Sequence, residues 1–118
     1  MAVVNIVPVQ LALNDGTLAP VQTALTSATD GALVPFVGAD NKMLIAISNV
    51  NVAAKTVTFK AGNGLQGVGD LTVSIGASET KYFPLESGKF KNVSGTNKGK
   101  MLIVGETTDI KVGAILLP

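Results

Sequence analysis

Apolar and polar side chains alternate along two central segments of the chain, with the period of two that is typical of β-strands. In residues 55–61, Val57 and Phe59 share one face, while threonine and lysine side chains share the other. Residues 71–75 repeat the pattern, and Leu71 is expected to face the core together with its apolar neighbours at i+2 and i+4. Both segments are therefore predicted to be half-buried strands.

Four further strands follow from the same pattern. Continuous apolar runs at residues 43–48 and 101–104 indicate strands that are covered on both faces. Residues 81–85 alternate again, but Pro84 cannot donate to a ladder and limits this segment to the edge of a sheet. A last strand is expected at residues 110–117.

Short polar segments that contain glycine separate these strands. Each places a residue that tolerates positive φ beside a polar partner, as tight turns require. No segment shows a sustained apolar period of 3.6 residues. The chain is therefore predicted to be all-β, as a single small β-sandwich or barrel. The turn segments are residues 14–16, 30–31, 63–64, 87–88 and 94–95.

Residues 1–22 differ from the rest of the chain, because they contain two prolines, no lysine and a single acid, Asp15. Two alternatives stay open for this segment: an ordinary first strand, or an extended arm that docks by adding a strand to the sheet edge of a partner. Under both alternatives, residues 23–118 form the β-sandwich domain. The candidate partner contacts on the arm are its apolar side chains: Val3, Val4, Ile6, Val7, Val9, Leu11 and Leu13.

Composition limits the chemistry that the chain can carry. Its 118 residues leave room for one domain, and 47% hydrophobic content with a mean hydropathy of +0.44 indicates a folded chain. Histidine, cysteine, tryptophan and arginine are all missing. The chain therefore lacks the usual ligands of catalytic metals, thiol nucleophiles, disulfides and the most common general base. We expect a protein that is not an enzyme and needs no cofactor or metal.

Charge and hydropathy also bear on partners. A formal net charge of +1 gives almost no long-range attraction to nucleic acid, so none is expected as a partner. The apolar runs are far shorter than the roughly 20 residues that cross a bilayer, and the first residues do not resemble a signal peptide. We therefore expect no membrane association and synthesis in the cytosol.

Residues 62–67 match the pattern G-x-G-x-x-G, but a strand is predicted to follow where a dinucleotide-binding turn needs a helix. We interpret the segment as a glycine-rich connection between strands, with Asp70 accepting hydrogen bonds from nearby backbone amides. Asp70, Glu79 and Glu86 are expected at turns and strand ends, among lysines, rather than facing one another across a cleft. A weak Ca²⁺ site in these loops stays open, without a motif to support it.

A basic cluster is expected in residues 87–99 and at the strand that follows. The first interpretation is a solvated hairpin, and the second is a contact with an acidic surface on a partner protein. The residues of the cluster are Lys89, Lys91, Lys98 and Lys100.

Three segments together resemble a known family. They are Lys55–Gly64 (KTVTFKAGNG), Gly67–Ile75 (GVGDLTVSI) and Phe83–Phe90 (FPLESGKF). The chain is similar to small β-domain structural proteins of tailed phages and prophages of Gram-positive bacteria, which are often encoded beside the major capsid protein. The resemblance covers residues 24–95 and extends more loosely through the C-terminal residues 115–118. The insertion at residues 92–100 and the lack of arginine depart from the family pattern and leave the partner contacts open.

The resemblance implies a virion structural role, with decoration of the head as the expected function. The major capsid protein is then the partner, and the chain would be made in the host cytoplasm and end on the capsid surface. Self-association as trimers and monomers that assemble only on the shell are both compatible with it. The alternative is an adhesion or carbohydrate-binding β-module of the tail or fibre, for which Tyr82 and four phenylalanines offer few aromatic platforms.

Overall fold

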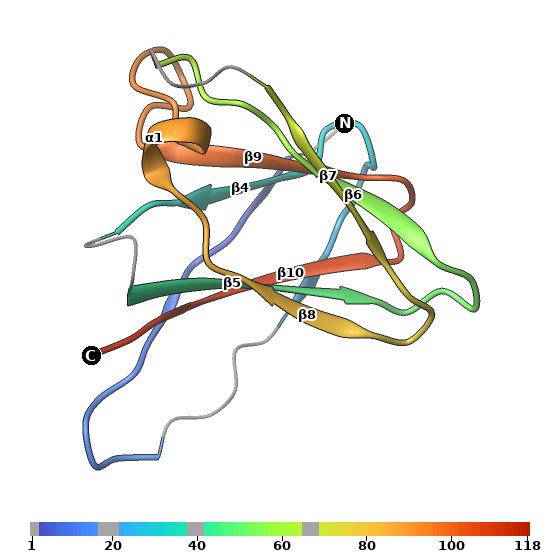
Figure 1. Cartoon of the computed structure of the whole chain (residues 1–118), viewed down its shortest axis with the longest axis horizontal. Coiled ribbons are helices and arrows are strands. Elements are labelled where there is room, and N and C mark those ends of the chain that lie inside the picture. Colours follow the sequence, from blue (N-terminus) through green and yellow to red (C-terminus); the bar gives the residue numbers. More distant parts are fainter. Residues whose placement is uncertain (1–2, 17–21, 38–41, 65–68) are drawn as a thin grey trace.

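The strands form where the apolar patterns lie, and they pack as two sheets face to face in a small β-sandwich (Figure 1). The computed structural model describes residues 3–16, 22–37, 42–64 and 69–118. The prediction of an all-β sandwich is confirmed. The strands are β1 (Val4–Asn5), β2 (Val9–Gln10), β3 (Thr23–Ala24), β4 (Ala32–Pro35), β5 (Met43–Asn49), β6 (Lys55–Phe59), β7 (Leu71–Ile75), β8 (Thr80–Phe83), β9 (Lys100–Gly105) and β10 (Ile110–Leu116), and the helix is α1 (Ser87–Phe90).

The first sheet has the strand order β1-β4-β9-β6-β7, and the second has the order β2-β10-β5-β8, with β3 also paired to β10. From β4 onward the chain passes between the sheets at every connection except β6–β7. The longest pairing joins β5 and β10, which are antiparallel over seven residues from Ile110↔Asn49 to Leu116↔Met43. These crossings tie the two sheets together in a chain that has no disulfide.

The core lies between the sheets and is built from the side chains that the alternation pointed inward. Val57 and Phe59 of β6 are fully buried, and so is Ile103 on the neighbouring strand β9. The Phe59 ring packs against Phe83 at 5.0 Å between centroids and against Phe90 at 6.4 Å. Burial of each such side chain stabilises the fold by about 1.5–3 kcal/mol. Packing of this kind is the main source of stability in the sandwich.

All six predicted strands are present, with shifts at their ends. The strand expected at residues 81–85 is β8, an edge strand as predicted, and it ends before Pro84. Leu71 is the register partner of the buried Phe59 and so shares the inward face, but it is 39% exposed, because it begins the edge strand β7 at the rim of the sandwich. The turn predicted at residues 87–88 is instead the single helical turn α1, which carries Phe90 into the core.

Gly31 confirms one of the predicted turns and shows why the turn needs glycine. Its φ of +67° lies in the left-handed region, and a Cβ there would overlap the carbonyl oxygen of Ile103 on β9. A side chain at this position would therefore be strained and would push β4 away from β9. No helix in the described part of the chain is long and apolar enough to cross a membrane.

Candidate partner-binding surface

The N-terminal segment lies along one edge of each sheet. Strand β1 pairs with β4 in parallel, and β2 pairs with β10 in parallel. Backbone hydrogen bonds fix both positions: the Ile6 N–H donates to the Leu33 carbonyl at 2.9 Å, and the Leu11 N–H donates to the Leu116 carbonyl at 2.8 Å. The segment is therefore extended, as an arm would be, and it also supplies short edge strands to its own sandwich. Residues 1–2 and 17–21 of this segment lie outside the described residues.

The seven apolar candidates on this segment have three different environments. Ile6 is 6% exposed and belongs to the core, so its side chain is not available to a partner in this conformation. Val7 and Leu13 are 82% and 76% exposed. The candidate contact surface thus narrows to these two side chains. The other four are half-buried: Val3, Val4, Val9 and Leu11.

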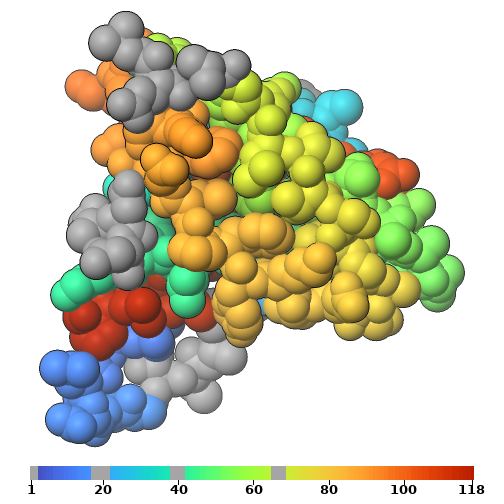
Figure 2. Space-filling view, in the orientation of Figure 1, coloured from blue at the N-terminus to red at the C-terminus, as the bar shows by residue number. Residues whose placement is uncertain are grey.

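Beyond β2 the chain leaves the body of the sandwich. Figures 1 and 2 show the blue segment up to residue 16 projecting at the lower left, away from the packed sheets. Residues 12–16 are all exposed, and Asn14 has a φ of +59°, in agreement with the turn predicted there. We call residues 11–16 the projecting loop. Leu13 is its exposed large apolar residue, and Asp15 is its only charged residue.

The basic cluster lies elsewhere. The hairpin that carries it closes by backbone bonds between Asn92 and the residues Gly99 and Lys100, with donor–acceptor distances of 2.7 and 3.0 Å. Figure 1 shows this orange segment at the opposite end of the view from the projecting loop. Lys89 and Lys98 are exposed, whereas Lys91 and Lys100 are half-buried. The two sets of candidates therefore do not form one continuous surface.

The carboxylates expected at turns and strand ends are engaged in local contacts. Asp70 accepts hydrogen bonds from the Ala61 N–H at 2.7 Å and from Lys60 Nζ at 2.8 Å, which confirms the bond predicted from Asp70 to a backbone amide. The Ala61 bond, and then Lys60, lower the pKa of Asp70. Glu79 accepts from the Gly76 N–H at 2.9 Å, and Glu86 lies 3.8 Å from Lys89. No group of three acids that could hold a metal ion occurs among the described residues.

The glycine-rich segment has a packing role at its first residue. The Gly62 N–H donates to the Lys89 carbonyl at 2.9 Å, and a Cβ on Gly62 would overlap the carbonyl oxygen of Lys91. Glycine therefore lets the end of the β6 segment approach the backbone around α1. Strand β7 follows this segment, where a dinucleotide-binding turn would open a helix. Residues 65–68, which include Gly67, lie outside the described part.

A groove of about 390 Å³ lies between the start of β7 and residues 84–90. Leu71, Pro84 and Leu85 supply apolar atoms to its wall, and Asp70, Glu86 and Lys89 supply charged ones. The charged groups are already engaged with one another or with the backbone, as described above. We therefore assign the groove no ligand.

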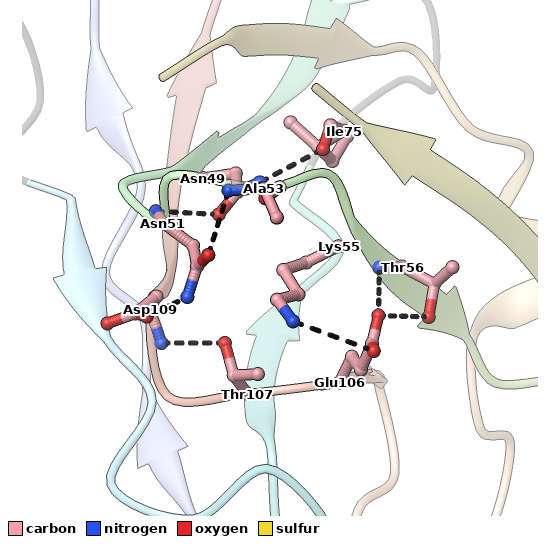
Figure 3. A network of polar contacts seen from close by, with 9 residues as sticks. All are labelled: Asn49, Asn51, Ala53, Lys55, Thr56, Ile75, Glu106, Thr107 and Asp109. Carbon is pink, nitrogen blue, oxygen red and sulfur yellow. Dashed lines mark hydrogen bonds and ion pairs between the residues drawn. The ribbon is translucent and has the colours of Figure 1, made fainter. Parts of the chain in front are cut away.

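Sequence analysis did not identify the polar network at the β5–β6 connection (Figure 3). Asn49 ends β5 and is 1% exposed. Its Nδ2 donates to the carbonyls of Ala53 and Ile75, each at 3.0 Å, and its Oδ1 accepts from the Asn51 N–H at 2.9 Å. One buried amide thus holds the loop after β5 against the end of β7 in the other sheet. The signal in the sequence was an amide at the end of a continuous apolar run.

The network continues to the β9–β10 connection. Asn51 Nδ2 donates to Asp109 Oδ2 at 2.7 Å, and the Thr56 N–H donates to Glu106 Oε1 at 3.0 Å. Lys55 Nζ lies 3.9 Å from Glu106 Oε2. Figure 3 shows these side chains gathered around the two connections that cross between the sheets. Each interacts within the chain, so the network holds the fold together rather than presenting free groups to a substrate.

No protein-family model matches the chain, and neither a curated protein nor a solved structure matches it.

Proposed function

We propose that this chain is a structural protein of a tailed-phage virion that decorates the head by binding the major capsid protein. The observation that supports the proposal best is the exposure of Val7 and Leu13, at 82% and 76%, on a segment with one acid and no lysine. Exposed large apolar side chains on a segment with a single charged residue are typical of protein contacts. The resemblance of residues 24–95 to phage head proteins supports the same assignment. Under this proposal the chain is made in the host cytoplasm and ends on the capsid surface.

Repetition of the capsid lattice makes modest contacts sufficient. Burial of one valine and one leucine contributes about 1.5–3 kcal/mol each. The two together change an affinity by roughly 10²- to 10⁴-fold, because each 1.4 kcal/mol is a factor of ten. Many copies bound in this way stabilise the shell by mass action, since they bind the assembled lattice and not its separated subunits. A β-sandwich that offers an apolar projection meets this requirement without catalytic groups.

The test is binding to heads that lack this chain. The variant carrying Val7→Ser and Leu13→Ser should keep its fold, because both side chains are exposed. Co-sedimentation with purified heads should show affinity at least about 100-fold weaker than that of the unmodified chain. Val52→Ser is the matched control, since Val52 is 95% exposed in the β5–β6 loop. Equal binding by the double variant and the control would refute Val7 and Leu13 as the contact, and absence of all binding would refute the capsid as the partner.

One observation favours a second candidate, an adhesion or carbohydrate-binding module of the tail. Tyr82 is 58% exposed on the edge strand β8, where its ring can stack on a sugar. A glycan array separates the two functions. A specific glycan signal that Tyr82→Ser abolishes would favour the carbohydrate-binding module over head decoration.

A further inference from the structure

The edges of the two sheets are protected in two different ways. At one side of the sandwich the edge strands are β7 and β8. Lys81 on β8 reaches across and donates its Nζ to the Ser74 carbonyl of β7 at 3.0 Å. An exposed lysine over an edge strand discourages pairing with another chain. On this side, the Lys81 side chain therefore opposes strand pairing with another chain.

The opposite edges are covered by the N-terminal segment. Strands β1 and β2 are two residues each, and they lie on the edges of β4 and β10. Strand β10 is seven residues long, and its central residues Val112 to Ala114 are buried. If the segment left, it would uncover the edge of β4, the end of β10 at Ile115 and Leu116, and the core site that Ile6 fills, while β3 would stay paired with Lys111 and Val112. The segment thus covers one edge of each sheet through two short pairings of two residues each.

We propose that residues 3–11 exchange between copies, so that β1 and β2 of one copy occupy the β4 and β10 edges of a second copy. The occupant is identified by the structure, because those edges already bind this same segment within one chain. In the exchanged pair Ile6 returns to an equivalent core site, and each backbone hydrogen bond is replaced by its counterpart. Exchange of an identical element is a low-cost route to association.

The connection to the rest of the chain is long enough for exchange. Leu11 and Gln22 are separated by eleven residue steps in the sequence, which can extend to about 36–40 Å. The longest dimension of the molecule is 37 Å. A connection of this length can therefore reach an adjacent copy while β3 stays on its own β10.

The same connection sets the concentration at which exchange occurs. A tether of eleven residue steps gives the segment an effective concentration on the order of millimolar at its own edge. The contacts are the same in both forms, so dilute protein stays closed and exchange needs a comparable concentration of neighbours. Copies side by side on a capsid lattice meet this condition; that consequence rests on the proposed function, whereas exchange itself does not.

Cross-linking tests the proposal, because the chain has no cysteine of its own. Val9 and Ile115 are register partners across β2 and β10, at a spacing that suits a disulfide. Two single variants, Val9→Cys and Ile115→Cys, are mixed, equilibrated and briefly oxidised without any capsid present. A mixed disulfide at this pair requires β2 of one copy on β10 of the other. Its yield should rise about 100-fold between ~10 µM and ~1 mM protein.

Two controls make the result decisive. Val9→Cys mixed with Val52→Cys measures chance collision at a side chain that is 95% exposed. The double variant Val9→Cys with Ile115→Cys shows that the disulfide closes within one chain at low concentration. If it fails to fold, Gln10 and Leu116 form a second register pair for the same design. Mixed-pair yields equal to the collision control, while the double variant closes, would overturn exchange and leave the head-binding test unaffected.

Discussion

Asn49 offers the sharpest test of how the sandwich is held together. Asn49→Asp keeps the size of the side chain and replaces its amide nitrogen by an oxygen. That nitrogen donates to the carbonyls of Ala53 and Ile75 at 3.0 Å and of Gly76 at 3.3 Å. The variant therefore sets oxygen against three carbonyl oxygens in a site where the side chain is 1% exposed. The acceptor bond from the Asn51 N–H is kept, so the change isolates the donor.

The cost follows from the bonds that are lost. Each buried carbonyl left without its donor costs about 1–3 kcal/mol, so we expect a loss of about 3–5 kcal/mol at pH 7. A chain of 118 residues has a total stability of about 6–18 kcal/mol. Tm should therefore fall by roughly 10–20 °C. Urea denaturation of both proteins, followed by circular dichroism, gives the difference in free energy of unfolding.

The loss of stability in Asn49→Asp should also depend on pH. Burial and the facing carbonyls raise the pKa of the new carboxyl in the folded state above its unfolded value of about 3.9. The folded variant therefore binds this proton more tightly than the unfolded variant does. Its free energy of unfolding falls as pH rises above about 4. The difference in free energy of unfolding between the variant and the unmodified protein should be smallest near pH 4 and largest near pH 7. Asn5→Asp, at an exposed position on β1, is the control and should change stability by about 0.5 kcal/mol or less. A loss below about 1 kcal/mol, or one independent of pH, would refute this account of the network.

Two further predictions concern a turn and an ion pair. Gly31→Ala should lower the free energy of unfolding by about 2–5 kcal/mol, because the positive φ of Gly31 and the adjacent β9 carbonyl both oppose a Cβ. Urea denaturation measures this loss. Gly16→Ala is the control and should change stability little, because a Cβ at Gly16 would have nothing within 4 Å. Asp70→Asn removes a carboxyl whose pKa is lowered from 3.8, chiefly by the Ala61 N–H and then by Lys60. The stabilisation from this carboxyl is present above pH 3.8 and is lost as pH falls through its lower folded pKa. The stability gap between this variant and the parent should therefore close in acid, and a gap constant with pH would contradict it.

The strands could be predicted because each carries its own pattern. Period-two alternation marked β6 and β7, and continuous apolar runs marked β5 and β9, all within a residue or two of their positions. Pro84 marked β8 as an edge strand because its missing N–H is a local property. The prediction that failed was the burial of Leu71. This residue has the pattern of a core residue, but its exposure depends on where the rim of the sandwich lies.

The polar network and the split of the N-terminal segment could not be predicted from local pattern. The buried amide of Asn49 meets the carbonyls of Ile75 and Gly76, which lie 26 and 27 residues away in the sequence, and residue spacing does not show that convergence. Ile6 and Val7 are adjacent and equally apolar, yet one is 6% and the other 82% exposed. Which of them faces inward depends on the parallel pairing of β1 with β4, a contact across about 28 residues. Long-range pairing of this kind leaves no mark within the segment itself.

Under the proposed function, the environment of Ile6 also constrains how the arm would meet a capsid. If docking pulled residues 3–11 off the sandwich and left Ile6 exposed, it would forfeit about 1.5–3 kcal/mol and open the β4 and β10 edges. A contact made by Val7 and Leu13 with the segment still in place loses none of this. Exchange between copies also restores the site that Ile6 fills. Head binding with the segment in place, in closed or exchanged copies, is therefore favoured over docking of a freed arm.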